Sequence, residues 1–266
     1  MSEPRPIILK IGGSVITDKN GELAPHTEVI DRLAGEIQKA NVKSLVVVHG
    51  GGSFGHPTAQ KHAIKDGYKE DAQKMGFSET HHVMTVLNGL VMDALVWHVV
   101  PAVSVSPSSC IITENGRIRS FEDTPLRMML NMGFYPVLFG DAVLDTKMGF
   151  TVLSGDQLVS ALATSLKTER VIIGVDVDGI YDADPKVKKA AKMIDHLTLT
   201  ELRSLQGILG KSTACDVTGG MFGKMTELVP AIEHGTQVSV VNATTAGNVY
   251  RALAGERVRG TTIQKE

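Results

Sequence analysis

Short runs of apolar and β-branched residues recur along the chain, each bounded by glycine, proline or charged residues. Several runs are apolar at every position, which is typical of parallel strands that helices cover on both faces of a sheet. The pattern predicts strands at Ile7–Ile11, Ser44–Val48, Ala102–Val105, Pro136–Phe139, Arg170–Val175 and Gln237–Val241.

Between these strands, apolar residues recur at helical spacing. His26–Ala40 places its aliphatic side chains on one face, and Ser78–His98 has a similar stripe. Two further helices are expected to begin at capping boxes, Ser154–Gln157 and Thr198–Glu201. Gly235 stands where a glycine would end a helix.

Two segments have the pattern of hairpins. Ile111–Phe121 has Asn115 and Gly116 at its centre, and Val143–Leu153 is expected to turn near Gly149. Strands and helices otherwise alternate over the whole length, which predicts an α/β protein built as a three-layer αβα sandwich. Because no linker or low-complexity tract divides the chain, we expect one domain over residues 1–266.

Composition narrows the class of protein. The 266 residues are 42% hydrophobic and 21% charged, enough for a large core, and the net charge of −2 argues against a nucleic-acid partner. Cys110 and Cys215 cannot form a disulfide framework, which favours a reducing, cytoplasmic setting. The N-terminus has no signal-peptide pattern, and an aspartate, a histidine and a proline interrupt the most apolar stretch, Gly89–Val105. No membrane association is expected.

Glycine is over-represented, with 27 residues in 266, against about 7% in average proteins. Many gather in clusters at strand-to-helix junctions: Lys10–Ser14, His49–His56, Val175–Tyr181 and Gly219–Lys224. Glycine lets backbone N–H groups approach an anion, and a helix N-terminus adds a favourable dipole. Three lysines add positive charge to these clusters: Lys10, Lys19 and Lys224. The clusters therefore predict phosphate binding.

Two other motifs fit less well. Gly50–Gly55 matches the dinucleotide-binding fingerprint, but Pro57 follows almost at once and that enzyme class has no use for the other clusters. Thr218–Met225 approximates a P-loop, but threonine replaces its first glycine and methionine follows its lysine. Neither motif is favoured.

The order of the motifs resembles that of the amino acid kinase superfamily over essentially the whole chain. The resemblance rests on Lys10-Ile-Gly-Gly-Ser14, Gly140-Asp141, Ser154-Gly-Asp156, Asp176-Val-Asp-Gly-Ile-Tyr181 with Asp184-Pro185, and Gly219-Gly-Met-Phe-Gly-Lys224. Within that superfamily, the octapeptide ending in His56 is similar to that of isopentenyl phosphate kinases. The resemblance implies a mainly parallel sheet of about eight strands, usually in a homodimer. An N-terminal lobe (about 1–168) would bind the acceptor, and a C-terminal lobe (about 169–266) would bind ATP.

The resemblance also implies roles for individual residues. Lys10, Lys19, His56 and Asp156 would be catalytic: Lys10 at the transferred phosphoryl group, Lys19 at the transition state, and Asp156 organising the lysines. Gly51, His56, Gly140 and Gly155 would bind the acceptor. The nucleotide would be held by Lys10, Gly12, Gly13, Ser14, Gly52, Asp176, Tyr181, Gly220 and Lys224. No protein metal ligand is expected, because Mg²⁺ would be held mainly by the nucleotide phosphates.

The implied reaction is ATP-dependent phosphorylation of isopentenyl phosphate to its diphosphate, a step of isoprenoid biosynthesis. A phosphate acceptor needs no general base, since its second pKa is about 6. The difficulty lies in bringing two polyanions together, which lysines and His56 would ease. His49 is interpreted as structural. Seven residues are candidates for an apolar tail pocket: Met75, Phe77, Val83, Met84, Val86, Leu87 and Leu90.

Other functions remain open at this stage. A fosfomycin-type kinase is similar in the same glycine loop and would phosphorylate a small phosphonate. A non-catalytic nucleotide or anion sensor could use the same fold, although the set of lysines with Asp156 argues against it. A dinucleotide oxidoreductase would rest on Gly50–Gly55 alone.

Overall fold

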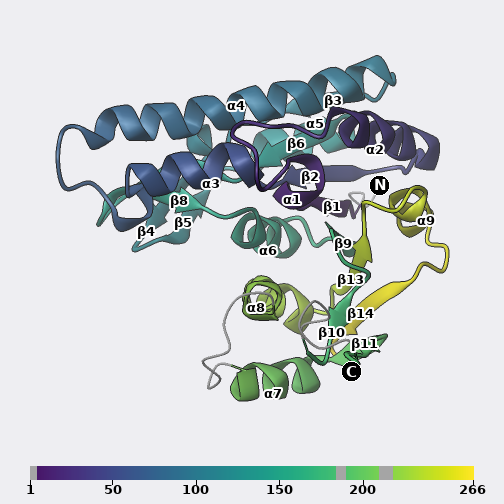
Figure 1. The fold of residues 1–266 in the computed structure, drawn as a ribbon. Helices are drawn as coiled ribbons and strands as arrows, with labels where there is room; N and C mark the ends of the chain where they lie inside the picture. Colours follow the sequence, from purple (N-terminus) through teal and green to yellow (C-terminus); the bar gives the residue numbers. More distant parts are fainter. Residues whose placement is uncertain (1–4, 184–189, 210–217) are drawn as a thin grey trace.

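The computed structural model describes residues 5–183, 190–209 and 218–266. Its central sheet has eight strands in the order β12-β14-β13-β9-β1-β2-β6-β3 (Figure 1), and every neighbouring pair is parallel except β13 with β14. The strands are β1 (Ile7–Ile11), β2 (Leu45–His49), β3 (Ala102–Ser104), β6 (Tyr135–Phe139), β9 (Arg170–Val175), β12 (His196–Thr198), β13 (Gln237–Asn242) and β14 (Gly260–Gln264). The expected α/β class and mainly parallel, eight-stranded sheet are confirmed.

Helices cover both faces of this sheet (Figure 1). Alternate side chains of a strand point to opposite faces, so the odd-numbered residues of β1 pack on one side and Ile8 on the other. The face of Leu9 is covered by α1 (Gly13–Ile16), α2 (Thr27–Ala40), α3 (Gly52–Lys61), α4 (Gln73–Trp97) and α9 (Asn248–Leu253). The face of Ile8 is covered by α5 (Thr124–Asn131), α6 (Gly155–Ser165), α7 (Leu199–Leu209) and α8 (Thr218–Glu233). Lys10 shares the face of Ile8, which turns its side chain toward α6.

Both hairpins form as expected, and together they make a second sheet in the order β5-β4-β7-β8. Its strands are β4 (Ile111–Glu114), β5 (Arg117–Phe121), β7 (Asp141–Asp145) and β8 (Gly149–Leu153). The carboxylate of Asp145 accepts hydrogen bonds from backbone N–H groups of both hairpin turns, at 2.8 Å from Gly116 and 2.8 Å from Lys147. Burial alone would raise the pKa of Asp145, but these bonds hold it well below its ordinary value. One aspartate therefore ties the two turns together.

Short elements complete the fold. They are η1 (Ile64–Asp66), η2 (Pro107–Ser109) and the small antiparallel pair β10 (Ile180–Tyr181) and β11 (Met193–Ile194). The long helix α4 begins at Gln73, five residues before the expected start at Ser78. The side chain of Gln73 accepts a hydrogen bond from the backbone N–H of Lys69 at 2.7 Å, which stabilises an earlier first turn.

The helix signals were correct at all three places, although one capping box forms only in part. Thr198 and Glu201 form the reciprocal capping box, with N–H to oxygen distances of 3.2 and 2.8 Å. Gly235 follows α8 with φ +89°, as a glycine that ends a helix does. At Ser154 only half of the box forms, since its hydroxyl accepts from Gln157 N but the Gln157 side chain binds the β4–β5 turn instead.

Candidate active site

Three of the glycine clusters meet at the carboxyl ends of adjacent central strands. Strand β1 lies between β2 and β9, with Ile11 opposite both His49 and Gly174. Just beyond these ends, Gly12 N donates to Gly174 O at 2.8 Å and Gly50 N donates to Ile11 O at 2.9 Å. Open α/β sheets bind ligands at such an edge.

The first two glycine loops touch backbone to backbone. Gly52 has φ +49°, and a Cβ added to it would lie 2.8 Å from Gly13 O, while one on Gly13 would lie 2.2 Å from Gly52 N. Thr17 joins the loops, because its hydroxyl donates to Gly13 O at 2.8 Å and accepts from Ser53 N at 3.0 Å. No local sequence signal pointed to Thr17.

Beside these loops lies a buried charged cluster. The Lys10 side chain is 3% exposed and pairs with Asp156, in the first turn of α6. Lys224 Nζ, on α8, lies 3.4 Å from the other oxygen of Asp156. Burial would raise the pKa of Asp156, but the two lysines outweigh it and hold that pKa below its ordinary value. Burial lowers the pKa of Lys10 below 10.5, although Asp156 opposes the shift. An ionised carboxylate thus holds two cations at the sheet edge.

Lys19 lies on the other side of the first loop. Its Nζ is 2.9 Å from Asp176 Oδ2, and its side chain is 61% exposed. Burial would raise the pKa of Asp176, but the bond from Lys19 and its charge lower it overall, with a smaller contribution from Ser14. The loop that follows β9 therefore holds Lys19 apart from the buried cluster.

A cavity of about 450 Å³ opens next to this cluster. Its lining includes the expected residues Lys10, Gly13, Gly51, His56, Gly140, Gly155, Asp156 and Lys224. The lining also includes the apolar residues Ala59, Ala63, Met84, Val152 and Leu153 and the polar residues Gln60, Lys65 and Asp66. His56 Nδ1 lies 3.2 Å from Gly52 O, so Nε2 is the ring atom left to meet a ligand. The cavity suits a molecule with an anionic head and an apolar body.

Comparison with known proteins agrees with this geometry. The model of the amino acid kinase family matches residues 5–242. The chain belongs to the amino acid kinase family. The isopentenyl phosphate kinase of Methanothermobacter thermautotrophicus is 43% identical over 265 residues, covering 97% of this chain and 98% of that protein. That of Methanocaldococcus jannaschii is 35% identical, covering 96% and 97%. A solved isopentenyl phosphate kinase structure superposes with a TM-score of 0.86 at 39% identity, covering 97% of this chain and 99% of that one.

Most of the expected site residues gather at this cavity, but some lie elsewhere. Gly12 precedes α1 and does not line the cavity, and Gly220 is in the first turn of α8. Tyr181 lies in β10, opposite Met193 of β11, and also does not line it. Asp184 and Pro185 of the sequence motif, like Cys215, lie outside the described residues.

Most of the residues considered for an apolar tail pocket lie away from this cavity. Of the seven candidates only Met84 lines the cavity, together with Thr80 one helical turn earlier. Leu87 is buried in the core, whereas Met75 and Val86 are 63% and 45% exposed. The others also miss it: Phe77 packs near Phe150, Val83 faces a separate surface depression with Pro57, and Leu90 packs on the core. A helix presents one face to the cavity, and α4 is apolar on several.

One buried polar group of the cavity lining, Asp141, was not among the expected site residues. Asp141 is at the start of β7, and its carboxylate accepts from Ala142 N at 2.8 Å and from the His81 ring at 3.0 Å. Burial raises the pKa of Asp141 although both bonds oppose it. The Gly140-Asp141 motif could have indicated Asp141, but its partner His81 is sixty residues away. His49 is structural as expected: it is buried and stacks on Phe139 at 5.5 Å between ring centroids.

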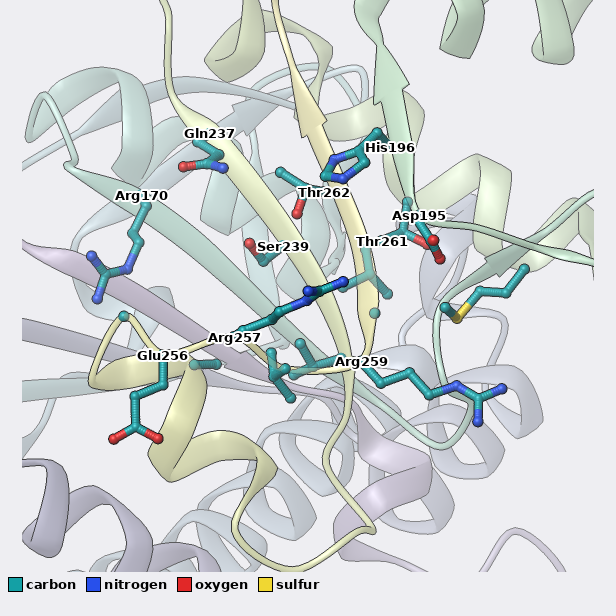
Figure 2. A pocket seen from close by; sticks show the side chains of 17 residues that line it. Arg170, Asp195, His196, Gln237, Ser239, Glu256, Arg257, Arg259, Thr261 and Thr262 are labelled. Carbon is teal, nitrogen blue, oxygen red and sulfur yellow. The ribbon is translucent and has the colours of Figure 1, made fainter.

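A second cavity, of about 630 Å³, lies over the open face of β12, β13 and β14 (Figure 2). Arg170, Arg257 and Arg259 border it with Asp195 and Glu256. Two of these arginines already pair within the protein, Arg170 with Glu169 and Arg259 with Asp178. The cavity contains none of the expected site residues, so the glycine-lined cavity is the candidate site.

Within residues 5–183, 190–209 and 218–266, no group of three or more His, Cys, Asp or Glu residues could hold a metal ion. Among the helices of those same segments, none combines the length and apolar character needed to span a bilayer.

Proposed function

We propose that this protein transfers the γ-phosphoryl group of ATP to isopentenyl phosphate, giving isopentenyl diphosphate and ADP. The observation that carries the proposal is the cavity whose lining combines Lys10, Lys224 and His56 with apolar residues such as Met84, Val152 and Leu153. A phosphate head and a short hydrocarbon tail match these two kinds of lining residue. The 43% identity to an isopentenyl phosphate kinase over nearly the full chain supports the same substrate.

The chemistry proposed is direct in-line transfer without a covalent intermediate. The acceptor phosphate is largely ionised at neutral pH, since its second pKa is about 6, so no general base is needed. The barrier lies in the approach of two polyanions and in charge on the transferred group. Lys10 would contact the transferred phosphoryl group, Lys19 would stabilise the transition state, and Asp156 would keep Lys10 and Lys224 aligned.

The acceptor phosphate would lie against the backbone of Gly51, Gly140 and Gly155, with His56 beside it. Since Nδ1 of His56 faces the carbonyl oxygen of Gly52, that nitrogen carries the proton. A hydrogen bond from Nε2 to the phosphate then requires the imidazolium form, which also supplies positive charge.

The nucleotide would be held from the other side of Lys10. Gly12, Gly13, Ser14, Gly52, Asp176, Tyr181, Gly220 and Lys224 are the residues proposed for this role. Two of the acidic residues proposed for this site, Asp156 and Asp176, already pair with lysines. That donor set fits Mg²⁺ entering with ATP, as part of the substrate and coordinated mainly by its phosphates.

We treat residues 1–266 as one amino acid kinase domain with an acceptor lobe (about 1–168) and a nucleotide lobe (about 169–266).

A homodimer is proposed through the β3 edge of the sheet. Trp97 and Val99 are 82% and 86% exposed, and Met132 is 65% exposed. Their loops are adjacent, since Tyr135 N donates to Pro101 O at 2.8 Å. Exposed apolar side chains on neighbouring segments favour association. Light scattering on the parent and on Trp97→Glu tests it, with a monomeric parent as the contrary result.

The test of function is an ADP-release assay with a panel of acceptors: isopentenyl phosphate, dimethylallyl phosphate, fosfomycin, acetylglutamate and uridylate. We expect the largest kcat/KM with isopentenyl phosphate. Preference for fosfomycin would instead assign a phosphonate kinase. ATP binding without turnover of any acceptor would assign a nucleotide sensor.

A further inference from the structure

A bidentate ion pair joins the tip of the β4–β5 hairpin to helix α8. Arg117, the first residue of β5, places both terminal guanidinium nitrogens 2.8 Å from the two carboxylate oxygens of Glu227. The hydrogen bonds to Glu227 raise the pKa of Arg117. The two residues are 110 positions apart and lie on opposite sides of the expected lobe boundary.

Hydrogen bonds hold the backbone of the hairpin tip that carries Arg117. Gln157 of α6 donates to Gly116 O at 3.1 Å and accepts from Ile118 N at 2.9 Å, so both neighbours of Arg117 are held. Gly116 N also donates to Asp145 at 2.8 Å. Arg117 therefore projects toward α8 from a defined backbone.

Glu227 stands three residues after Lys224 on α8, and residues at this spacing are neighbours on a helix surface. Lys224 reaches Asp156, which directly precedes Gln157 on α6. The contacts thus form a closed circuit: Arg117 with Glu227, Lys224 with Asp156, and Gln157 with the hairpin tip.

The circuit gives Lys224 two possible carboxylate partners, Asp156 and Glu227. An unpaired Glu227 would attract Lys224 at the i, i+3 spacing and would add negative charge beside a site for polyphosphate. Arg117 occupies both oxygens of Glu227. The side chains of this ion pair are 62% and 26% exposed, so the pair contributes little to stability. Its bidentate geometry is better explained by a role in positioning Glu227.

We propose that Arg117 is a positioning residue that occupies Glu227 and so leaves Lys224 directed at Asp156 and the nucleotide phosphates. The inference rests on the nucleotide role of Lys224 in the proposed function. It adds the hairpin of the acceptor lobe to the nucleotide site.

The experiment measures the Kd of a non-hydrolysable ATP analogue and the KM for ATP. Arg117→Gln is expected to raise both about three- to fivefold, and the effect should shrink in 0.5 M salt. Glu227→Gln should stay within twofold of the parent, and the double variant Arg117→Gln/Glu227→Gln should recover most of the loss. Arg117→Lys keeps the charge but cannot occupy both oxygens of Glu227 in the same bidentate way, so its effect should lie between the parent and Arg117→Gln.

Arg119→Gln is the matched control. Arg119 lies on the same strand with similar exposure, but its partner is Glu114 within the hairpin, at 2.8 Å. Equal effects of Arg117→Gln and Arg119→Gln would overturn the inference. So would a double variant as weak as Arg117→Gln, which would indicate loss of a structural tie. Because analogue binding needs no acceptor, failure to phosphorylate isopentenyl phosphate would reject the proposed function and leave this inference standing.

Discussion

Lys10 lies on β1, an interior strand of the central sheet, and 3% of its side chain is exposed. Its ammonium group pairs with the carboxylate of Asp156 on α6. Strand alternation explains the meeting, because Lys10 shares its face with Ile8 and that face is covered by α6. A buried lysine is costly unless it is paired, so the arrangement depends on Asp156 as much as on Lys10.

Asp156→Asn should therefore act through the pKa of Lys10. Burial already lowers that pKa below 10.5, and Asp156 is the main group that raises it. Without the carboxylate the pKa falls further, so Lys10 loses its charge at a lower pH. In pH profiles of kcat, the alkaline limb should move to lower pH, and kcat at pH 7 should fall at least about a hundredfold.

Asp123→Asn is the control for that change. Asp123 also pairs with a cation, Arg127, but at a half-buried place outside the cavity. It should alter stability without moving the alkaline limb. If the alkaline limb of the kcat profile of Asp156→Asn stayed at the same pH as that of the parent, protonation of Lys10 would not control kcat.

His56→Ala should raise the KM for the acceptor and leave the Kd for ATP nearly unchanged. It removes one charge-assisted hydrogen bond, worth about 1.5–3 kcal/mol, which corresponds to roughly a 10- to 150-fold change. Steady-state kinetics gives the acceptor KM, and equilibrium binding of a non-hydrolysable ATP analogue gives the Kd. His82→Ala, an exposed histidine that does not line the cavity, should change neither. A change in the Kd for ATP as large as the change in the KM for the acceptor would contradict the assignment of His56 to the acceptor.

Met84→Ala should widen the apolar part of the cavity. Met84 is buried, and its sulfur lies against the positions of Gly51 and Gly55, so it closes the wall beside the phosphate end. We expect a higher KM for isopentenyl phosphate, because apolar contact is lost, and a better relative kcat/KM for longer prenyl phosphates. Val86→Ala, on the exposed side of the same helix, should leave the acceptor preference unchanged. Identical chain-length profiles in both variants would remove Met84 from the tail pocket.

The sequence predicted the features that depend on local signals. Apolar runs located six of the eight central strands but missed β12 and β14. Glycine clusters at the strand ends pointed to the candidate site, because adjacent parallel strands bring their carboxyl ends together. Thr17 between the loops, His81 on Asp141, and Arg117 on Glu227 were beyond its reach, since each contact depends on how distant segments pack. The wall of the cavity was missed for a related reason. Apolar residues occur on several faces of α4, so their pattern does not say which face turns inward.

Asp145→Asn should destabilise the sheet formed by the two hairpins. This sheet contributes two residues, Val152 and Leu153, to the lining of the cavity. Its carboxylate accepts bonds from the backbone N–H groups of Asn115, Gly116, Lys147 and Met148. An amide keeps one acceptor oxygen, so part of that set is lost. We expect the Tm at pH 7 to fall by roughly 4–8 °C.

The pH dependence of that Tm difference follows from the lowered pKa of Asp145. A carboxyl group whose pKa is depressed by folding contributes stability above its unfolded pKa, about 3.9, and loses it as pH falls toward the folded value. The Tm gap between parent and variant should thus be full at pH 6–7 and shrink below about pH 4. Glu122→Gln, an exposed carboxylate on the same hairpin segment, is the control and should show a smaller gap throughout. A gap that stays constant down to pH 3 would show that the charge of Asp145 does not hold the two turns together.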